Sequence, residues 1–204
     1  MLLYLQKELK KATNTGATRV MLDRLGIQMH FNNKVAKQVM WKKPPPNIIM
    51  LNTDGTLQAG LAGYGGLFRD AEGRVLLIYK GGSRKRSILL LELLGIEAGL
   101  SIAVTMGIHS LQVNSDSERA VNIVNGTEDA PWYCLNVLQA IKAHKMTFTS
   151  LEVTHIYREG NRAADFIAKS CHEDASIACH IGPLEEKLAV IVQEDASGCT
   201  YTRF

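Results

Sequence analysis

The stretch Asn47-Ile-Ile-Met-Leu-Asn-Thr-Asp-Gly-Thr56 decides how the rest of the chain is interpreted. Its apolar run has the length of a β-strand and ends at an Asp-Gly pair, which is typical of a turn. Residues 60–69 and 74–80 (RVLLIYK) follow, with the turn Asp70-Ala-Glu-Gly73 between them. We therefore predict three antiparallel strands joined by short turns.

Four glycines, Gly60, Gly63, Gly65 and Gly66, lie close together in the second of these strands. Such a group can form a phosphate-binding loop, but no Gly-Lys-Ser/Thr sequence follows it and no helix begins there. We favour a turn and a strand that another segment approaches closely.

Beyond Lys80 the apolar spacing becomes helical. Residues 87–106 place most apolar side chains on one broad face, and Gly107 is suited to end the helix. The pattern then predicts a strand at 110–114, helices at 117–125 and 131–144, a strand at 151–156 and a helix that begins at Arg162. This order predicts an α/β fold with a mixed five-stranded sheet, three antiparallel strands followed by parallel strands, flanked by helices.

The length of 204 residues suits one domain of ordinary size with tails, and the hydrophobic fraction of 46% predicts a real core. The three prolines at 44–46 stop a helix and favour an extended linker. We divide the chain into a basic N-terminal arm and linker (1–43), a folded domain (44–175) and an acidic C-terminal tail (176–204). Within the tail, 184–191 has weak helical character and 194–204 is expected to be mobile.

The net charge of +3 is unevenly distributed. The arm holds nine Lys/Arg against two acids, residues 44–170 hold twelve of each, and residues 171–204 hold six acids against two bases. A basic arm can add salt-dependent affinity for phosphates, or it can be a solvated, loosely ordered tail. Its leucines at 2, 5 and 9, and the apolar residues at 20, 22 and 25, have roughly helical spacing.

The four cysteines are scattered without a paired C-x₂-C spacing, so free thiols in a reducing compartment are favoured over a zinc site. The apolar runs are strand-sized or broken by charge, short of the ~18 residues that span a bilayer. We expect an intracellular monomer with no membrane span and no small-molecule cofactor, nuclear or cytoplasmic. An organelle is the alternative, because the arm is basic and poor in acids.

Four acids lie at the ends or starts of predicted elements. Asp54 ends the first strand, Asp116 ends the fourth, Glu92 lies in the first turns of the long helix and Asp165 is near the start of the last. If strands one and four are neighbours, these acids can converge on one point. Each also has a plainer explanation: a turn for Asp54, a solvated helix face for Glu92 and a helix start for Asp116.

Carboxylate oxygens are the ligands that Mg²⁺ prefers. Clustered carboxylates repel one another, so the four acids would need cations to stay fully ionised. Two ions about 3.5–4 Å apart can activate a water and stabilise the leaving oxygen in a displacement at phosphorus. The sequence therefore predicts a site for two Mg²⁺ ions, for which Mn²⁺ can substitute.

The chain resembles the type 1 ribonuclease H family, in particular the plant ribonuclease H-like domains related to those of non-LTR retroelements. The resemblance covers about residues 41–172 and is most specific in His155-Ile-Tyr-Arg-Glu-Gly-Asn-Arg-Ala-Ala-Asp165. The other matching stretches are Trp41-Lys-Lys-Pro44, Leu51-Asn-Thr-Asp-Gly-Thr56, Ala62-Gly-Tyr-Gly-Gly66, Arg69-Asp70, Leu91-Glu-Leu93 with Gly99-Leu100, and Asn114-Ser-Asp-Ser117.

The resemblance implies a ribonuclease H-like fold in which Asp54, Glu92, Asp116 and Asp165 bind the metals. It also implies that His155 lies on a flexible loop near them, where it moves a proton or helps product leave. A lone histidine more often has no such role.

The substrate implied is an RNA–DNA hybrid, whose RNA strand is cut to leave a 3′-hydroxyl and a 5′-phosphate. Gly55, Thr56 and the backbone around Asn52 are candidate contacts to the RNA, which is recognised through its 2′-hydroxyls.

Two features depart from the family pattern. Leu91 and Gly95 stand where alanines are usual, and Gly95 costs up to about 1 kcal/mol of helix propensity. The basic handle of bacterial members is not evident. Substrate affinity is therefore assigned to Arg84, Lys85 and Arg86 or to the basic arm, although adjacent basic residues are also common on plain solvated surface.

Three hypotheses follow. The complete acidic quartet favours an active endoribonuclease. The departures keep open a retroelement-derived domain that is catalytically weak or inactive and binds nucleic acid or a protein partner. A third hypothesis, a structural or regulatory domain that acts through its tails, predicts no binding to a hybrid.

Overall fold

The computed structural model describes residues 16–27, 36–58, 60–171 and 176–203. The chain divides into two compact units, Gln38–Tyr201 and Met1–Lys37 with Thr202–Phe204. In the smaller unit, the helix α2 (Gly16–Arg24) contains two of the three apolar residues expected to be helical at 20, 22 and 25. The patch predicted at residues 2–9 lies outside the described residues. Strands β1 (Lys37–Val39) and β8 (Tyr201–Arg203) form a two-stranded sheet.

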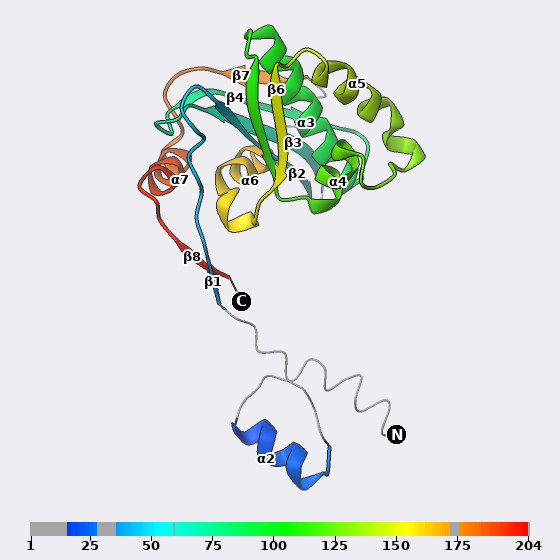
Figure 1. Ribbon diagram of the computed structural model, residues 1–204, viewed down its shortest axis with the longest axis vertical. Coiled ribbons are helices and arrows are strands. Elements are labelled where there is room, and N and C mark those ends of the chain that lie inside the picture. Colours follow the sequence, from blue (N-terminus) through cyan, green and yellow to red (C-terminus); the bar gives the residue numbers. More distant parts are fainter. Residues whose placement is uncertain (1–15, 28–35, 59, 172–175, 204) are drawn as a thin grey trace. The chain divides into compact units, whose positions relative to one another are not determined.

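The larger unit is built on a mixed six-stranded sheet with the order β6-β5-β2-β3-β4-β7 (Figure 1). Strands β2 (Ile49–Gln58), β3 (Leu61–Arg69) and β4 (Val75–Gly82) are antiparallel. Strands β5 (Ser110–Ser115) and β6 (Ser150–His155) extend the sheet in parallel with β2. The predicted fold class is confirmed. The sheet has six strands instead of five because β7 (Ala178–His180) pairs antiparallel with β4.

Helices cover both faces of the sheet because its strands alternate apolar side chains toward each face. Leu51, Phe68 and Leu77 belong to the larger core, which they share with helices of one face. Their neighbours Leu67 and Ile78 belong to a second core on the other face. The helices of the first face are α3 (Ile88–Thr105), α4 (Glu118–Asn125) and α5 (Leu135–Lys145), and those of the second are α6 (Arg162–Lys169) and α7 (Glu186–Ala196) (Figure 1).

The C-terminal segment differs from the predicted acidic tail at 176–204. Its helix α7 places Leu188 and Val192 in the second core, and both side chains are buried. These two residues are four positions apart and so share one helix face. The weak helical character expected at 184–191 corresponds to the first part of α7. One of the acids of the segment, Asp195, is buried against a cation on the sheet.

The segment before β2 also differs from the predicted linker. Residues 40–46 have no regular helix or strand, as three prolines predict, but Trp41 is only 3% exposed. Its ring packs over the guanidinium group of Arg69 on β3, 3.7 Å from the ring centre. The larger unit therefore begins at Gln38, before the boundary expected at residue 44.

One helix, α3, is long and apolar enough to cross a membrane by length and composition alone, with a mean hydropathy of 1.9 over 18 residues. Glu92 and Glu97 interrupt it, and 61% of it is buried inside the unit. It packs against β2, β3 and α5. We interpret it as the central core helix.

Candidate metal centre

The sheet register brings two of the predicted acids together. Strands β2 and β5 run parallel, and their pairing ends at Thr53 opposite Ser115. The next residue on each strand is an aspartate, so Asp54 and Asp116 emerge side by side. We predicted that Asp54 ends its strand, but β2 continues along β3 as far as Gln58.

Two glycines let α3 bring Glu92 to the same point. A Cβ atom on Gly55 would lie 2.5 Å from the backbone nitrogen of Glu92, and one on Gly95 would lie 2.5 Å from Oγ1 of Thr53. Either contact would be too close for a real side chain, so α3 can sit directly on β2 only because both residues are glycines. Gly95 therefore has a packing role that offsets its poor helix propensity, and the neighbouring Leu91 is a fully buried core residue.

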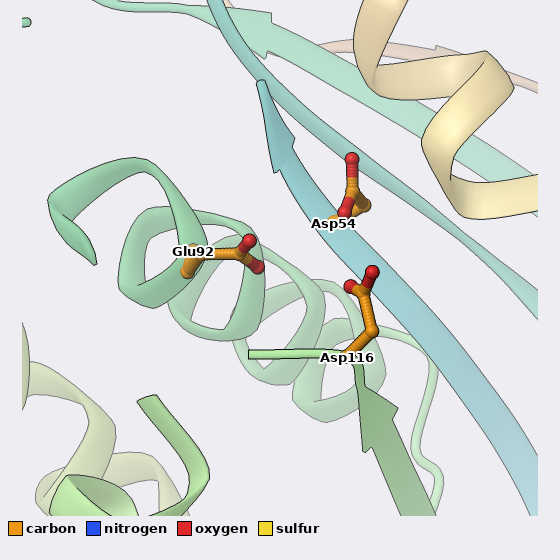
Figure 2. Close-up of side chains that lie close together, drawn as sticks. All are labelled: Asp54, Glu92 and Asp116. Carbon is orange, nitrogen blue, oxygen red and sulfur yellow. The ribbon is translucent and has the colours of Figure 1, made fainter. Parts of the chain in front are cut away.

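The three carboxylates of Asp54, Glu92 and Asp116 form one cluster, which we call the acidic triad. They offer ligand atoms that all lie within 4.8 Å of one another, and Figure 2 shows the side chains converging from β2, α3 and the end of β5. Asp54 is 5% exposed and Glu92 is 6% exposed. The hydroxyl of Ser115 donates to Glu92 at 3.4 Å, and the backbone N–H of Gly55 also donates to its carboxylate.

Burial and mutual repulsion make this cluster unfavourable when fully charged. Burial is the main cause that raises the pKa of Asp54 to about 9, followed by the negative charges of Glu92 and Asp116, a hydrogen bond to Asp116 and the charge of Asp165. Burial likewise raises the pKa of Glu92 to about 8, with added repulsion from Asp116 and Asp165 and opposing hydrogen bonds from Gly55 and Ser115.

The donor set of the acidic triad fits a hard divalent cation. Three carboxylates supply only oxygen ligands, which suit Mg²⁺ or Mn²⁺ better than softer metals. A cation bound among them would replace protons that Asp54 and Glu92 otherwise keep near neutral pH.

Asp165, the fourth predicted ligand, is not part of the acidic triad. Its two carboxylate oxygens pair with separate cations, Arg158 at 3.0 Å and Lys169 at 2.6 Å. It still lies near enough to raise the pKa values of Asp54 and Glu92. The structure thus places Asp165 beside the cluster, with its charge compensated by α6 and the turn before it.

His155 lies at the same edge of the sheet. It is the last residue of β6 and pairs with Ser115 of the parallel strand β5. Ser115 immediately precedes Asp116 in the chain. Its ring meets that of Tyr157 edge-on, with 6.0 Å between ring centres. His155 is therefore the last residue of a strand, whereas the resemblance implied a flexible loop.

The predicted nucleic-acid contacts separate into buried and exposed residues. The side chain of Asn52 is completely buried, and Gly55 and Thr56 are buried within β2, so the contact to RNA expected of Gly55, Thr56 and the backbone around Asn52 stays a prediction. The side-chain amide of Asn52 is occupied by partners inside the protein. In contrast, Arg84, Lys85 and Arg86 are all exposed on the loop that leads into α3.

Asn161 is a residue of this site to which the sequence reasoning gave no role. It immediately precedes α6 and is completely buried. Its amide nitrogen donates to the carbonyl of Thr53 at 2.9 Å and to a carboxylate oxygen of Asp116 at 3.1 Å. It lies within the stretch 155–165, where the resemblance to the ribonuclease H family is most specific. That position was the signal in the sequence that could have indicated a role for Asn161.

Comparisons with known proteins agree with this geometry. The family model described as reverse transcriptase-like matches residues 52–171, more than half of the chain. The Arabidopsis thaliana protein named "Putative ribonuclease H protein At1g65750" is 27% identical over 176 residues, which cover 83% of this chain. This chain corresponds to only 28% of that protein's length.

Solved ribonuclease H structures share the fold. The N-terminal RNase H domain of Rv2228c from Mycobacterium tuberculosis superposes with a TM-score of 0.57 at 25% identity, covering 60% of this chain and 91% of that one. LC11-RNase H1 from compost, solved in complex with an RNA/DNA hybrid, gives a TM-score of 0.56 at 23% identity over 60% of this chain and 95% of that one. This chain therefore belongs to the reverse transcriptase-like family, and its larger unit has the ribonuclease H fold.

Proposed function

We propose that this domain is an endoribonuclease that hydrolyses the RNA strand of RNA–DNA hybrids with the help of two divalent cations. The observation that carries the proposal is the acidic triad, three carboxylates within 4.8 Å of one another on a ribonuclease H fold. The product would carry a 3′-hydroxyl on one fragment and a 5′-phosphate on the other.

The chain's own residues have distinct tasks in this proposal. Asp54, Glu92 and Asp116 would hold the cations, Mg²⁺ in the first place, with Mn²⁺ as a substitute. When bound, such a cation lowers the pKa of a water and stabilises charge at phosphorus. Asp165 would complete the set once its carboxylate turns from Arg158 and Lys169, to which it is paired.

We assign proton transfer or product release to His155. Its imidazole ends β6 beside the strand that leads to Asp116, and the edge contact with Tyr157 orients the ring. An imidazole nitrogen can accept a proton and return it, which is the task that we propose for this residue.

The substrate class is supported by charge and by fold. A related fold, LC11-RNase H1, was solved with an RNA/DNA hybrid. In this chain, the exposed Arg84, Lys85 and Arg86 precede the helix that carries Glu92, and the arm holds nine basic residues. Both groups can contact phosphates without reading sequence.

The test is a cleavage assay on the full chain with an end-labelled RNA–DNA hybrid in Mg²⁺, in Mn²⁺ and in EDTA. Asp54→Asn and Asp116→Asn remove one ligand each, while Asp129→Asn makes the same change at an exposed acid after α4. We expect cleavage in both metals, none in EDTA, and loss only in the first two variants. Cleavage that survives in Asp54→Asn and Asp116→Asn would reject the site.

One observation favours the second candidate, a domain that binds a hybrid without cutting it. Both carboxylate oxygens of Asp165 pair with side-chain cations, so in this arrangement Asp165 is not available to bind a metal ion. In that case the hybrid would bind with a salt-dependent affinity, and neither metal would produce fragments.

A further inference from the structure

A buried polar chain leads away from the acidic triad, and it begins at Asn161. The two hydrogens of this side-chain amide go to the Thr53 carbonyl and to Asp116. The amide oxygen accepts from the side-chain nitrogen of Asn52 at 3.2 Å. Because both ends of the amide are engaged, its nitrogen can only point toward Asp116.

The orientation of Asn52 is fixed in turn by two donors on its oxygen. Trp41 donates through its indole nitrogen at 3.1 Å, and Arg69 donates at 2.8 Å. Asn52 and Asp54 are two residues apart on β2 and so project from the same face of the sheet. The polar chain therefore runs along that face, beside the triad.

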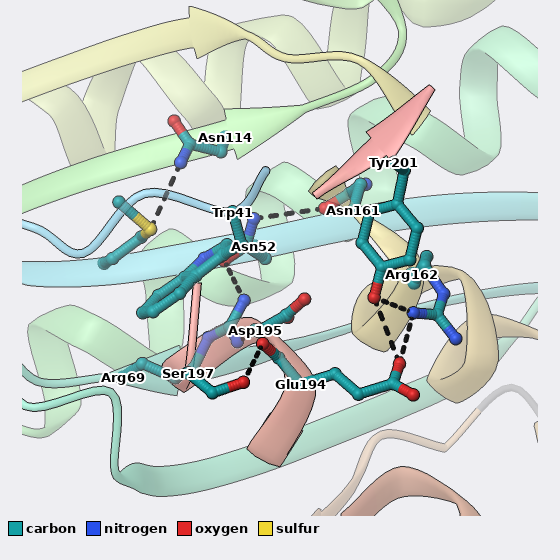
Figure 3. Close-up of polar contacts among 11 residues, drawn as sticks. Trp41, Asn52, Arg69, Asn114, Asn161, Arg162, Glu194, Asp195, Ser197 and Tyr201 are labelled. Carbon is teal, nitrogen blue, oxygen red and sulfur yellow. Dashed lines mark hydrogen bonds and ion pairs between the residues drawn. The ribbon is translucent and has the colours of Figure 1, made fainter. Parts of the chain in front are cut away.

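The chain of contacts ends on helix α7. The other amino group of Arg69 pairs with Asp195 at 2.8 Å, and both side chains are completely buried (Figure 3). A second set of polar contacts also joins α6 to α7. Arg162, which follows Asn161, donates hydrogen bonds to the carboxylate of Glu194 and to the hydroxyl of Tyr201. Two neighbouring residues at the start of α6 are thus linked to two neighbouring residues of α7.

These contacts extend beyond the residues that the family model matches, although Trp41 lies within the resemblance found in the sequence. Residues 52–171 match the family model, whereas Trp41 precedes them and Asp195 follows them. Breaking a buried ion pair leaves a charge without a partner, so the pair Arg69–Asp195 fixes α7 on the sheet firmly.

We propose that Asn161 is a positioning residue for Asp116, and that Trp41 and Asp195 hold it in place through Asn52 and Arg69. Trp41 and α7, which flank the residues matched by the family model, are then part of the support of the metal centre. This inference rests on the proposed function only in that the acidic triad binds a divalent cation. Groups that orient metal ligands commonly affect metal affinity by 10–100-fold.

The experiment measures Mn²⁺ binding to the full chain by calorimetry, at a temperature where circular dichroism shows each variant folded. Asn161→Ala removes all three hydrogen bonds of the side-chain amide, those to Thr53 and Asp116 and the one from Asn52. Asn125→Ala is the matched control, because Asn125 also donates its amide to a strand carbonyl, that of Val153, but at the end of α4. We expect Mn²⁺ affinity to fall by about 10-fold or more in Asn161→Ala and to stay unchanged in the control.

The connection to α7 is tested with two variants at residues that do not touch the acidic triad. Trp41→Phe keeps the ring over Arg69 and removes only the bond to Asn52, and Asp195→Asn removes the charge that pairs with Arg69. Each should weaken Mn²⁺ binding by about 2–10-fold, the worth of one net hydrogen bond. The double variant Trp41→Phe/Asn161→Ala should bind Mn²⁺ about as weakly as Asn161→Ala alone, because both changes act through the side-chain amide of Asn161.

The outcomes separate this inference from the metal site itself. If the unaltered chain does not bind Mn²⁺, the metal centre is rejected and the inference with it. If the unaltered chain binds Mn²⁺ and Asn161→Ala binds it equally well, only the inference is overturned. Lower melting temperatures with unchanged Mn²⁺ affinity in Trp41→Phe and Asp195→Asn would limit α7 to a structural role.

Discussion

Asp54 is held beside two other carboxylates in a buried place, and its raised pKa reflects the free energy that this costs. Removing such a group from water disfavours its charged form, and each neighbouring negative charge adds to the effect. Binding of a divalent cation reverses the balance, because the cation favours the ionised acids. At the scale of the residue, the site is thus unfavourable when charged and empty of cations, and favourable when a cation is bound.

This balance predicts how the stability of the metal-free protein depends on pH. The pKa of Asp54 is raised to about 9 and that of Glu92 to about 8, both above ordinary values. A raised folded pKa contributes stability that is present below the unfolded pKa and lost as pH rises through the folded value. We expect the melting temperature in EDTA to fall between pH 5 and 9 as these two acids ionise.

Asp54→Asn provides the control for that prediction. The amide of the new side chain cannot ionise. The loss of the negative charge at position 54 also removes its repulsion of the Glu92 carboxylate. In EDTA this variant should melt at a higher temperature than the unaltered protein at pH 8.5, and the two should converge at pH 5. Mg²⁺ should raise the melting temperature of the unaltered protein at pH 8.5 and have little effect on the variant. A melting temperature for the metal-free protein that rises over this range would contradict the assignment.

At the scale of the element, the distance between α3 and β2 decides whether Glu92 reaches the site. Gly55 on the strand and Gly95 on the helix leave no room for a Cβ atom between them and the opposite element. Gly95 thus lowers the helix propensity of α3 locally. Because glycine has no Cβ atom, it also lets α3 approach β2 closely enough for Glu92 to reach the site.

Gly95→Ala tests this interpretation, because local and packing effects have opposite signs. Helix propensity alone would stabilise the variant by up to about 1 kcal/mol. The new Cβ atom would instead press on Thr53 and force α3 away from β2, which costs about 1–3 kcal/mol. We expect net destabilisation in chemical unfolding and weaker Mn²⁺ binding. Val104→Ala, at an exposed position of α3, should do neither.

The sequence allowed the elements to be predicted better than their contacts. Apolar patterns predicted the succession of strands and helices along the chain. The meeting of Asp54 and Asp116 was expected on the condition that strands one and four are neighbours, which the sheet order β6-β5-β2-β3-β4-β7 fulfils. The pairing of Asp165 with Arg158 and Lys169, and the role of Asn161, depend on contacts between elements distant in sequence, which no local pattern encodes. Residues 184–191 showed weak helical character, but the packing of Leu188 and Val192 of α7 into the second core was not predicted, because these two apolar residues are set among acids.

At the scale of the whole molecule, two separate groups of basic residues are candidates for the proposed binding of nucleic acid. One is the loop of Arg84, Lys85 and Arg86 within the larger unit, and the other is the arm. The buried Trp41 shows where the arm can be removed safely: a deletion must stop before β1, which begins at Lys37.

Deletion of residues 1–36 removes six of the nine basic residues of the arm. If the arm binds phosphates, the hybrid should bind more weakly, and the logarithmic dependence of affinity on salt should become shallower by about 0.7–0.9 for each phosphate that the arm neutralises. Fluorescence anisotropy with a labelled hybrid at several salt concentrations measures both quantities. Changing Arg84, Lys85 and Arg86 to Gln is the comparison, and unchanged affinity in the deletion would assign binding to this loop.

We propose above all that the acidic triad binds the cations with which this domain cuts the RNA strand of a hybrid. The most direct test of this proposal is the single-turnover rate of cleavage in Mg²⁺ by the full chain, by Asp54→Asn and by Asp129→Asn. We predict metal-dependent cleavage that falls by at least about 100-fold in Asp54→Asn, since metal-bound charge stabilisation is worth several kcal/mol, and stays unchanged in Asp129→Asn. Equal rates in all three proteins, or cleavage that persists in EDTA, would contradict the account.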